Sequence, residues 1–408
     1  MRDFYPEDMA IRNRLFEAWG RAARRFGFQQ YDACVVESLD LLRRKAGEEI
    51  VSQIYHFTDK SGRELALRPE MTPTLARMVA ARQEALSLPL KWFAIAQCFR
   101  YERMTKGRRR EHFQWNLDVL GTESVAAEAE VVACAFAALE DLGLTSSDVA
   151  VFCNSRALLA ELFHRMEIAG QHHASTFLAL DKRGKVADTE IRAVLEESGL
   201  DAAHVSRVFE LLQVSDLDQA EELLGGETPA LRALRDFMAL VHAYGIEDAV
   251  VFDISVIRGL AYYTGIVFEA FDRAKESRAV FGGGRYDNLA ADIGGKPLSG
   301  VGLGFGDVVV MDLLEAKGSL AGDAAGGVLV GFMQEQQRGM AVQVARLLRS
   351  RDRDVDLGLR PEKAKTFFSR AGKGSYREAV YIGPDDVEKG TVRVKNLATR
   401  EETELMVP

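Results

Sequence analysis

The residues between Lys91 and Gly121 include the densest group of side chains that could take part in chemistry. In the second half of this stretch polar and apolar residues alternate strictly, which predicts a strand with two different faces. The polar face would carry an imidazole, amides and a carboxylate, which donate and accept hydrogen bonds on one surface. The polar residues are His112, Gln114, Asn116 and Asp118, and the apolar residues are Phe113, Trp115, Leu117 and Val119.

Charged residues precede this strand. Residues 91–102 are mostly apolar and β-prone, which predicts a buried strand that ends near Glu102. Residues 105–110 read TKGRRR and predict a long hairpin loop with a basic tip. If strand periodicity continues up to the loop, Arg100 and Glu102 share a face with the polar row. The alternative is an ordinary hairpin with one solvated face.

A second candidate site lies at a predicted corner between a strand and a helix. Residues 55–59 and 64–67 predict a hairpin, and a helix follows to about Arg82. Glu70 and Thr72 stand at the corner, where a carboxylate and a hydroxyl oxygen would suit an ammonium group. Taken alone, Glu70 would also fit as a carboxylate at the start of the helix.

Strand character returns in residues 250–253 and 256–269. The second segment contains Arg258 and the pair Tyr262-Tyr263, for which a turn with an exposed cation is the alternative interpretation. Glycine-rich segments follow at 282–287 (GGGRYD) and 300–306 (GVGLGFG). A dinucleotide-binding interpretation of these glycines is poor, because the required strand, turn, helix and downstream acid are not in place.

The other elements frame these candidates. Helices are predicted from Pro6 to Gly27 and over 125–142, and the chain is helical and acidic from about 154 to 244. The pair His172-His173 lacks the spacing of a helical metal site, so solvated surface is the better interpretation. Residues 321–327 predict a linker. Beyond it, β and α segments alternate over about 80 residues, which predicts a small separate domain.

Composition excludes several classes of protein. The chain has 408 residues, 47% hydrophobic and 28% charged, which excludes a disordered chain. No apolar run reaches the length of a membrane span, and we expect no signal peptide. The four cysteines are scattered, which indicates a reducing, cytoplasmic compartment. Net charge is −9, but from Gly326 onward there are 15 Lys and Arg against 12 Asp and Glu, which favours a local nucleic-acid footprint.

These segments together resemble the histidyl-tRNA synthetases, a family of class II aminoacyl-tRNA synthetases. FRYER, KGRRREHFQ and NLDVLG resemble the second signature motif of the class, and LRPEMTP and RGLAYYTG resemble two further elements. The likeness runs from RDFYPED, which the family usually places a few residues later, so we expect a trimmed start. Residues 28–39 resemble the first motif, which implies a homodimer.

The resemblance implies an α+β fold with a class II antiparallel sheet core and a small C-terminal α/β domain like those that bind anticodons. The implied boundaries are 1–153 and 246–320 for the two parts of the catalytic core, 154–245 for a helical insertion that contacts tRNA, 321–326 for a linker and 327–408 for the anticodon-binding-like domain.

The implied reaction joins L-histidine and ATP into histidyl-adenylate, and the histidyl group then passes to histidine tRNA. Arg100 and Arg258 would be catalytic, on two sides of the α-phosphate, with Arg258 in a role that some related enzymes give to a metal. No dedicated metal site is expected, and Mg²⁺ would lie on the outer phosphates. The implied histidine-binding residues are Glu70, Thr72, Gln114, Asp118, Tyr262 and Tyr263, and the implied ATP-binding residues are Arg100, Glu102, Arg108 and His112.

The sequence departs from the family pattern at several positions. Val309 replaces a third-motif arginine that contacts ATP, and His112 replaces an aromatic residue that stacks on adenine. Arg109 stands where an aromatic is common, so we hypothesise that Arg109 reaches the outer phosphates; the alternative is that Arg109, like Arg110, contacts tRNA. The remaining departures are Asp118 for glutamate, Cys34 for proline and Ala261 for aspartate.

Two functions follow. The first is ATP-dependent ligation of histidine to tRNA. The second is a catalytically silent relative that acts as a regulatory or RNA-sensing subunit, which the missing third-motif arginine favours. Retention of Arg100, Arg258, Glu70 and Gln114, together with the C-terminal domain, favours the enzyme.

Overall fold

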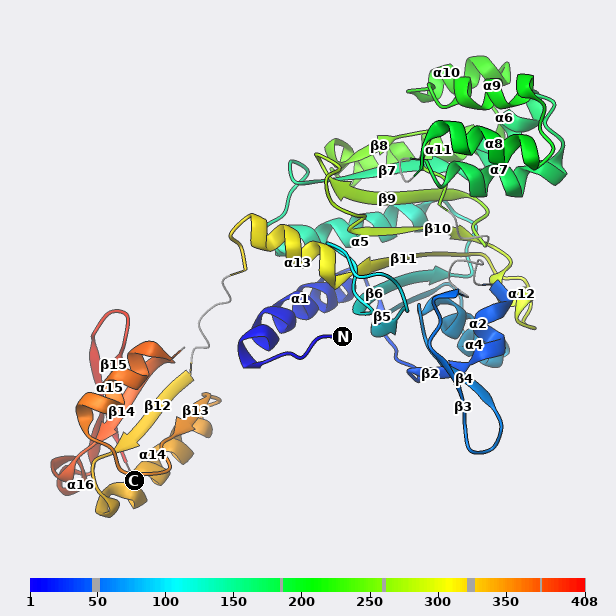
Figure 1. Ribbon diagram of the computed structural model, residues 1–408. Coiled ribbons are helices and arrows are strands. Elements are labelled where there is room, and N and C mark those ends of the chain that lie inside the picture. Colours follow the sequence, from blue (N-terminus) through cyan, green and yellow to red (C-terminus); the bar gives the residue numbers. More distant parts are fainter. Residues whose placement is uncertain (46–51, 184–185, 259–261, 321–326, 375, 408) are drawn as a thin grey trace. The chain divides into compact units, whose positions relative to one another are not determined.

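The computed structural model forms two compact units, Met1–Leu320 and Ala321–Pro408 (Figure 1). It describes residues 1–408 except 46–51, 184–185, 259–261, 321–326, 375 and 408. In the described residues no helix is long and apolar enough to cross a membrane. Of the cysteines, Cys34 is exposed, and Cys98, Cys134 and Cys153 are buried free thiols.

An eight-stranded sheet organises the first unit. Its order is β1-β5-β6-β11-β10-β9-β7-β8, antiparallel from β5 to β7, with β1 and β8 added in parallel at the two edges. The strands in this order are Gln29–Gln30, Leu90–Phe99, Glu111–Leu120, Gly300–Gly306, Phe281–Tyr286, Ile266–Asp272, Val149–Ser155 and Val250–Phe252.

Helices cover the apolar face of this sheet. α1 (Pro6–Arg25) packs on α5 (Ala126–Asp141), and α5 packs on β6 and β11, while α13 (Asp307–Ala316) packs on β6. Trp19 of α1 stacks on Trp115 of β6 with ring centroids 5.8 Å apart, and Phe305 of β11 lies 6.0 Å from Trp115. The predicted alternation of β6 is therefore confirmed, because its apolar row forms the core.

The predicted end of the first hairpin strand is wrong. β5 ends at Phe99 rather than near Glu102, opposite Glu111 of β6. Beyond Phe99 the Tyr101 amide donates to the carbonyl oxygen of Gln53 at 2.7 Å, and the Glu102 amide donates to the Arg100 carbonyl at 3.0 Å. Strand alternation therefore does not position Arg100 and Glu102.

The predicted hairpin and the helix after it are confirmed. β3 (His56–Thr58) pairs with β4 (Glu64–Leu67), and β2 (Val36–Ser38) completes a three-stranded sheet in the order β2-β4-β3. The other elements here are α2 (Leu39–Lys45), α4 (Thr72–Arg82) and α12 (Leu289–Asp292).

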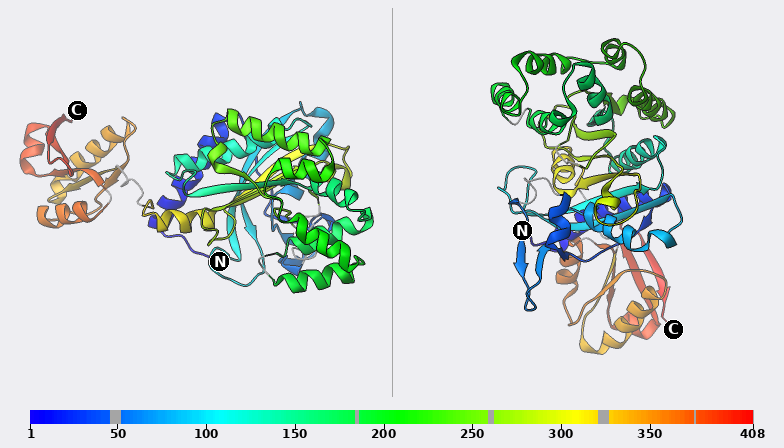
Figure 2. Two further views of the ribbon diagram at one scale, coloured as in Figure 1. Left: turned by 90° about the horizontal axis from the view of Figure 1, so that it is seen from above. Right: turned by 90° about the vertical axis from the view of Figure 1, so that its right-hand side faces the viewer.

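Among the described residues, six α-helices occupy the predicted helical region, and they gather at the β7–β8 end of the large sheet (Figures 1 and 2). His172 shares a hydrogen bond of 2.9 Å with the Ser198 carbonyl, and His173 one of 3.1 Å with the Ile168 carbonyl, so both rings help to hold this fold. The helices are α6 (Arg156–Arg165), α7 (His173–Leu180), α8 (Asp188–Glu197), α9 (Ala202–Leu211), α10 (Leu217–Leu224) and α11 (Pro229–Ala243).

The second unit is a five-stranded sheet in the order β13-β12-β14-β15-β16 with helices, and the predicted β/α alternation is confirmed. Its elements are β12 (Gly327–Phe332), α14 (Arg338–Arg349), β13 (Val355–Leu357), α15 (Ala364–Lys373), β14 (Tyr376–Ile382), α16 (Pro384–Lys389), β15 (Thr391–Asn396) and β16 (Glu402–Met406). The sequence analysis did not find α16 or β16.

Candidate active site

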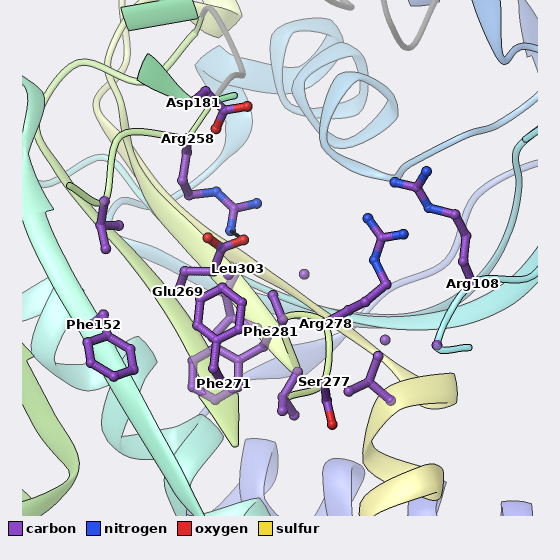
Figure 3. Close-up of a pocket in the computed structure, with 18 of the residues that line it drawn as sticks. Arg108, Phe152, Asp181, Arg258, Glu269, Phe271, Ser277, Arg278, Phe281 and Leu303 are labelled. Carbon is purple, nitrogen blue, oxygen red and sulfur yellow. Dashed lines mark hydrogen bonds and ion pairs between the residues drawn. The ribbon is translucent and has the colours of Figure 1, made fainter. Parts of the chain in front are cut away.

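A cavity of about 1200 Å³ lies against the polar face of the large sheet (Figure 3). Its walls come from the hairpin loop 105–109, the corner residues Glu70 and Thr72, strands β9 to β11 and the start of α13. Five insertion residues complete them: Leu180, Asp181, Arg183, Val186 and Asp188. It brings together most of the predicted site residues: Glu70, Thr72, Arg100, Glu102, Arg108, Arg109, His112, Gln114, Arg258, Tyr262 and Tyr263.

Glu70 forms an acidic pocket at one end of the cavity. Its side chain is buried, and the Tyr262 hydroxyl donates to Oε2 at 3.3 Å, whereas Oε1 has no hydrogen-bond partner among the described residues. Burial raises the pKa of Glu70, and the charges of Arg100 and Arg258 partly oppose this rise. A buried carboxylate with an unpartnered oxygen, in the same cavity as Thr72, suits a ligand ammonium group.

Asp118 lies behind the wall of the cavity. It is not among the described lining residues, but the hydroxyl of Tyr286, which does line it, donates to Asp118 Oδ1 at 2.6 Å. Burial raises the pKa of Asp118 to about 7, although the hydrogen bond from Tyr286 acts in the opposite direction. The sequence analysis missed Tyr286. Strand alternation in GGGRY would have placed it on the same face as Gly282 and Gly284.

Glycines make the floor of the cavity. A Cβ atom on Gly302 would lie 2.0 Å from Asp118 Oδ1, and one on Gly304 would lie 1.8 Å from Gln114 Nε2. A Cβ atom on Gly282 would lie 1.5 Å from Arg258 Nη1. The glycine-rich strands β10 and β11 therefore let polar side chains from other elements lie flat across the sheet.

Arg258 extends over this floor from a left-handed backbone conformation, with φ of 54°. Such a conformation is uncommon for a residue other than glycine and is frequent at functional sites. Nη1 donates to Glu269 Oε1 at 3.2 Å. Burial acts to lower the pKa of Arg258, but Tyr263 and Glu269 outweigh it, so the pKa is raised and the charge is retained. Residues 259–261, including the departure at Ala261, lie outside the described residues.

Arg100 and His112 both line the cavity. Arg100 Nε donates to the Pro69 carbonyl at 3.0 Å, which ties this arginine to the corner that carries Glu70. Burial and the Arg100 charge lower the pKa of His112 to about 3, so its imidazole is neutral at pH 7. Its Nε2 lies 3.4 Å from Gln114 Oε1, which confirms that the two share one face.

The hairpin loop closes the other end. Arg108 forms an ion pair with Glu102 at 2.8 Å, and Arg109 Nη1 donates to the Thr105 carbonyl at 3.0 Å. Arg110 is not among the described lining residues; its guanidinium lies over the Tyr101 ring at 4.5 Å. The structure therefore separates Arg110 from the other two arginines.

The sequence analysis missed several charged residues at the cavity, and two of them matter here. Arg278, between β9 and β10, extends into the cavity, and Asp181, at the end of α7, lies near Arg258 (Figure 3). Neither belongs to a motif or a periodic segment, so no local signal in the sequence could have indicated them. Val309 also lines the cavity, close to Gly107 and Arg278.

The mainly antiparallel sheet, its motif-bearing hairpin and the separate five-stranded domain define the class II aminoacyl-tRNA synthetase architecture that the sequence predicts. The sequence pattern of the family described as histidyl-tRNA synthetase matches residues 1–306, and that of an anticodon binding domain matches residues 326–407. This chain belongs to the histidyl-tRNA synthetase family.

Individual relatives support this family assignment. The chain is 41% identical to the chloroplastic/mitochondrial histidine–tRNA ligase of Arabidopsis thaliana, over 98% of this chain and 83% of that protein. It is 40% identical to the histidine–tRNA ligase of Opitutus terrae, over 99% of this chain and 94% of that protein. The histidyl-tRNA synthetase structure from Nostoc shares its fold, with a TM-score of 0.82 and 21% identity over 99% of this chain and 95% of that one. The predicted family and fold class are confirmed.

Proposed function

We propose that this chain is a histidine–tRNA ligase, which joins L-histidine to histidine tRNA through a histidyl-adenylate. The observation that carries the proposal is the convergence of Glu70, Arg100 and Arg258 on one cavity. An acceptor for an ammonium group and two guanidinium groups for phosphates are what an amino acid and ATP need side by side. Membership of the family supports the same activity, since the relatives above are named histidine–tRNA ligases.

Histidine would occupy the acidic end. Its ammonium group would bind Glu70 and Thr72, and its imidazole would lie among Gln114, Tyr262 and Tyr263. Asp118 would act on the ring through the Tyr286 hydroxyl that it holds. Such polar partners discriminate strongly against a side chain that lacks ring nitrogens, because they would be left buried and unpaired.

The first step would be attack of the histidine carboxylate oxygen on the α-phosphorus of ATP. A new P–O bond forms while the bond to pyrophosphate breaks, and negative charge grows on the phosphate oxygens. Arg100 and Arg258 would stabilise that charge in a site where their positions are already fixed. In the second step a tRNA hydroxyl attacks the histidyl carbonyl, and AMP leaves.

ATP would extend from the two arginines to the hairpin loop. Neutral His112 would stack on adenine, and Glu102 and Arg108 would help to hold the nucleotide. Mg²⁺ would arrive with ATP on its outer phosphates, since Mg²⁺ in such sites is held largely by phosphates and water. Among the described residues no cluster of three or more metal-ligating side chains occurs.

Partners of the chain are also proposed. Residues 327–408 would bind the anticodon, the insertion 154–245 would contact the tRNA body, and Arg110 would contact tRNA at the loop. A homodimer is supported by apolar side chains exposed on and beside the three-stranded sheet, at Val35, Val36 and Phe57. Unpaired cysteines support a cytoplasmic setting.

The test is histidine-dependent ATP–pyrophosphate exchange on the purified chain, followed by charging of a histidine tRNA transcript. We expect both activities, and exchange with histidine only. A chain that folds and binds tRNA but shows neither activity would instead be a silent, RNA-sensing relative.

A further inference from the structure

The hairpin-loop end of the cavity holds more cations than the proposed reaction has used. Lys106, Arg108, Arg109 and Arg278 all line it. Arg108 is paired with Glu102, so its charge is largely balanced within the protein. An excess of positive charge in a cavity favours a ligand with several negative charges at this end.

Arg278 lies beside Gly107 of the hairpin loop. A Cβ atom on Gly107 would lie 3.4 Å from both Cγ and Cδ of Arg278 and 3.3 Å from Cγ2 of Val309. Gly107 also has a φ of 71°, which favours glycine. Arg278 and Val309 therefore border the same point of the loop, and Figure 3 shows the guanidinium groups of Arg278 and Arg108 both extending into the cavity.

The segment that carries Arg278 is fixed on both sides. Asp272 accepts hydrogen bonds from the amides of Glu276 and Ser277 at 3.1 and 2.7 Å, and the Val280 amide donates to the Ala270 carbonyl at 2.7 Å. A cation on such a segment needs little reorganisation to bind a ligand.

We propose that Arg278 binds the outer phosphates of ATP and supplies the positive charge that position 309 lacks. This inference rests on the proposed function, which assigns Arg100 and Arg258 to the α-phosphate. The β- and γ-phosphates would then extend toward the loop end. Arg109 is the alternative candidate; its Nη1 donates to the carbonyls of Thr105 and Arg108 in its own loop.

The test compares ligands that differ only in the outer phosphates. For Arg278→Gln in the full-length chain, we expect the KM for ATP in pyrophosphate exchange and the Kd of a non-hydrolysable ATP analogue to rise about 10- to 100-fold, as expected for one charge-assisted hydrogen bond. The Kd of AMP and the KM for histidine should stay within about twofold of wild type.

Arg273→Gln is the matched control. Arg273 lies in the same connection and is not among the described lining residues; it donates to the Ser146 and Asp248 carbonyls. This control loses the same charge and should leave the affinity for ATP unchanged. The double variant Arg278→Gln/Val309→Arg should regain part of the ATP affinity, because both positions border Gly107.

Three results would overturn the proposal. They are an unchanged ATP affinity in Arg278→Gln, an equal loss for ATP and AMP, and a loss in Arg109→Tyr that Arg278→Gln does not show. Each of these leaves the proposed function intact if the wild type supports exchange. A wild-type chain without histidine-dependent exchange and without ATP binding would reject both inferences.

Discussion

Replacing Gly282 by alanine should remove activity without unfolding the protein. The new Cβ atom would lie 1.5 Å from Arg258 Nη1 and 2.6 Å from Cζ, whereas ordinary contact begins near 3.4 Å. The guanidinium must therefore move by about 2 Å. Its contact with Glu269 would break, and the guanidinium would leave the position from which we propose that it binds the α-phosphate. Misplacing or losing one group that stabilises transition-state charge costs about 100- to 1000-fold in rate, or roughly 3–4 kcal/mol.

The assay is pyrophosphate exchange at saturating histidine and ATP, with the thermal midpoint of Gly282→Ala measured in parallel. Stability should change little, because the displaced atoms are the end of a flexible side chain. Two controls bracket the result. In Gly283→Ala the Cβ atom would lie 2.1 Å from the Gly302 carbonyl oxygen, so this variant should lose stability because the sheet itself is disturbed. In Gly170→Ala the Cβ atom would meet no described atom within 4 Å, so this variant should keep both stability and activity. Wild-type exchange in Gly282→Ala would refute this placement of Arg258.

Three further outcomes are expected. Arg258→Ala should lower exchange by about 3–4 kcal/mol of transition-state stabilisation while the protein stays folded; near-normal exchange would remove Arg258 from the mechanism. A chain ending at Leu320, where the first unit ends, should still activate histidine but charge tRNA poorly, and equal loss of both steps would make the second unit part of the catalytic body. Because the pKa of Asp118 is raised from 3.8 to about 7, its ionisation lowers stability as pH rises through that window. Asp118→Asn should therefore gain stability relative to wild type by about 1.4 kcal/mol per pH unit between about pH 5 and pH 7, measured as the difference in unfolding free energy, and a difference that does not vary with pH would contradict this.

The features that the sequence predicted well are set by neighbouring residues within one segment of the chain. The alternation of β6 indicated correctly that His112 and Gln114 face the cavity and that the apolar row enters the core, because a strand fixes the direction of successive residues. Asn116 and Asp118 of the polar row are buried and are not among the lining residues. The predicted end at Glu102 failed because an amide of this segment bonds to Gln53, a residue far away in sequence. Motif resemblance placed Glu70 and Arg258, which no periodicity connects.

The remaining site residues depend on pairing between distant segments. Tyr286 of β10 meets Asp118 of β6 across the intervening strand β11, and the register of these pairings cannot be found from either segment alone. Arg278 lies beside Gly107 of the hairpin loop, a contact between segments about 170 residues apart in the sequence. The glycines of β10 and β11 could be recognised as a motif. Their role, which is to leave room for the side chains of Arg258, Asp118 and Gln114, requires knowledge of the folded structure.

Of the four cysteines, only Cys34 is exposed to thiol reagents in the folded protein. The thiolate is the nucleophile that attacks a thiol reagent. Burial raises the pKa of Cys98 and of Cys153 to about 12 and also raises the pKa of Cys134. A maleimide dye should therefore label native protein at Cys34, with no need to substitute the other cysteines. Since Cys34 lies in the segment that resembles the dimer motif, the labelling rate would report directly on whether a second copy covers this surface.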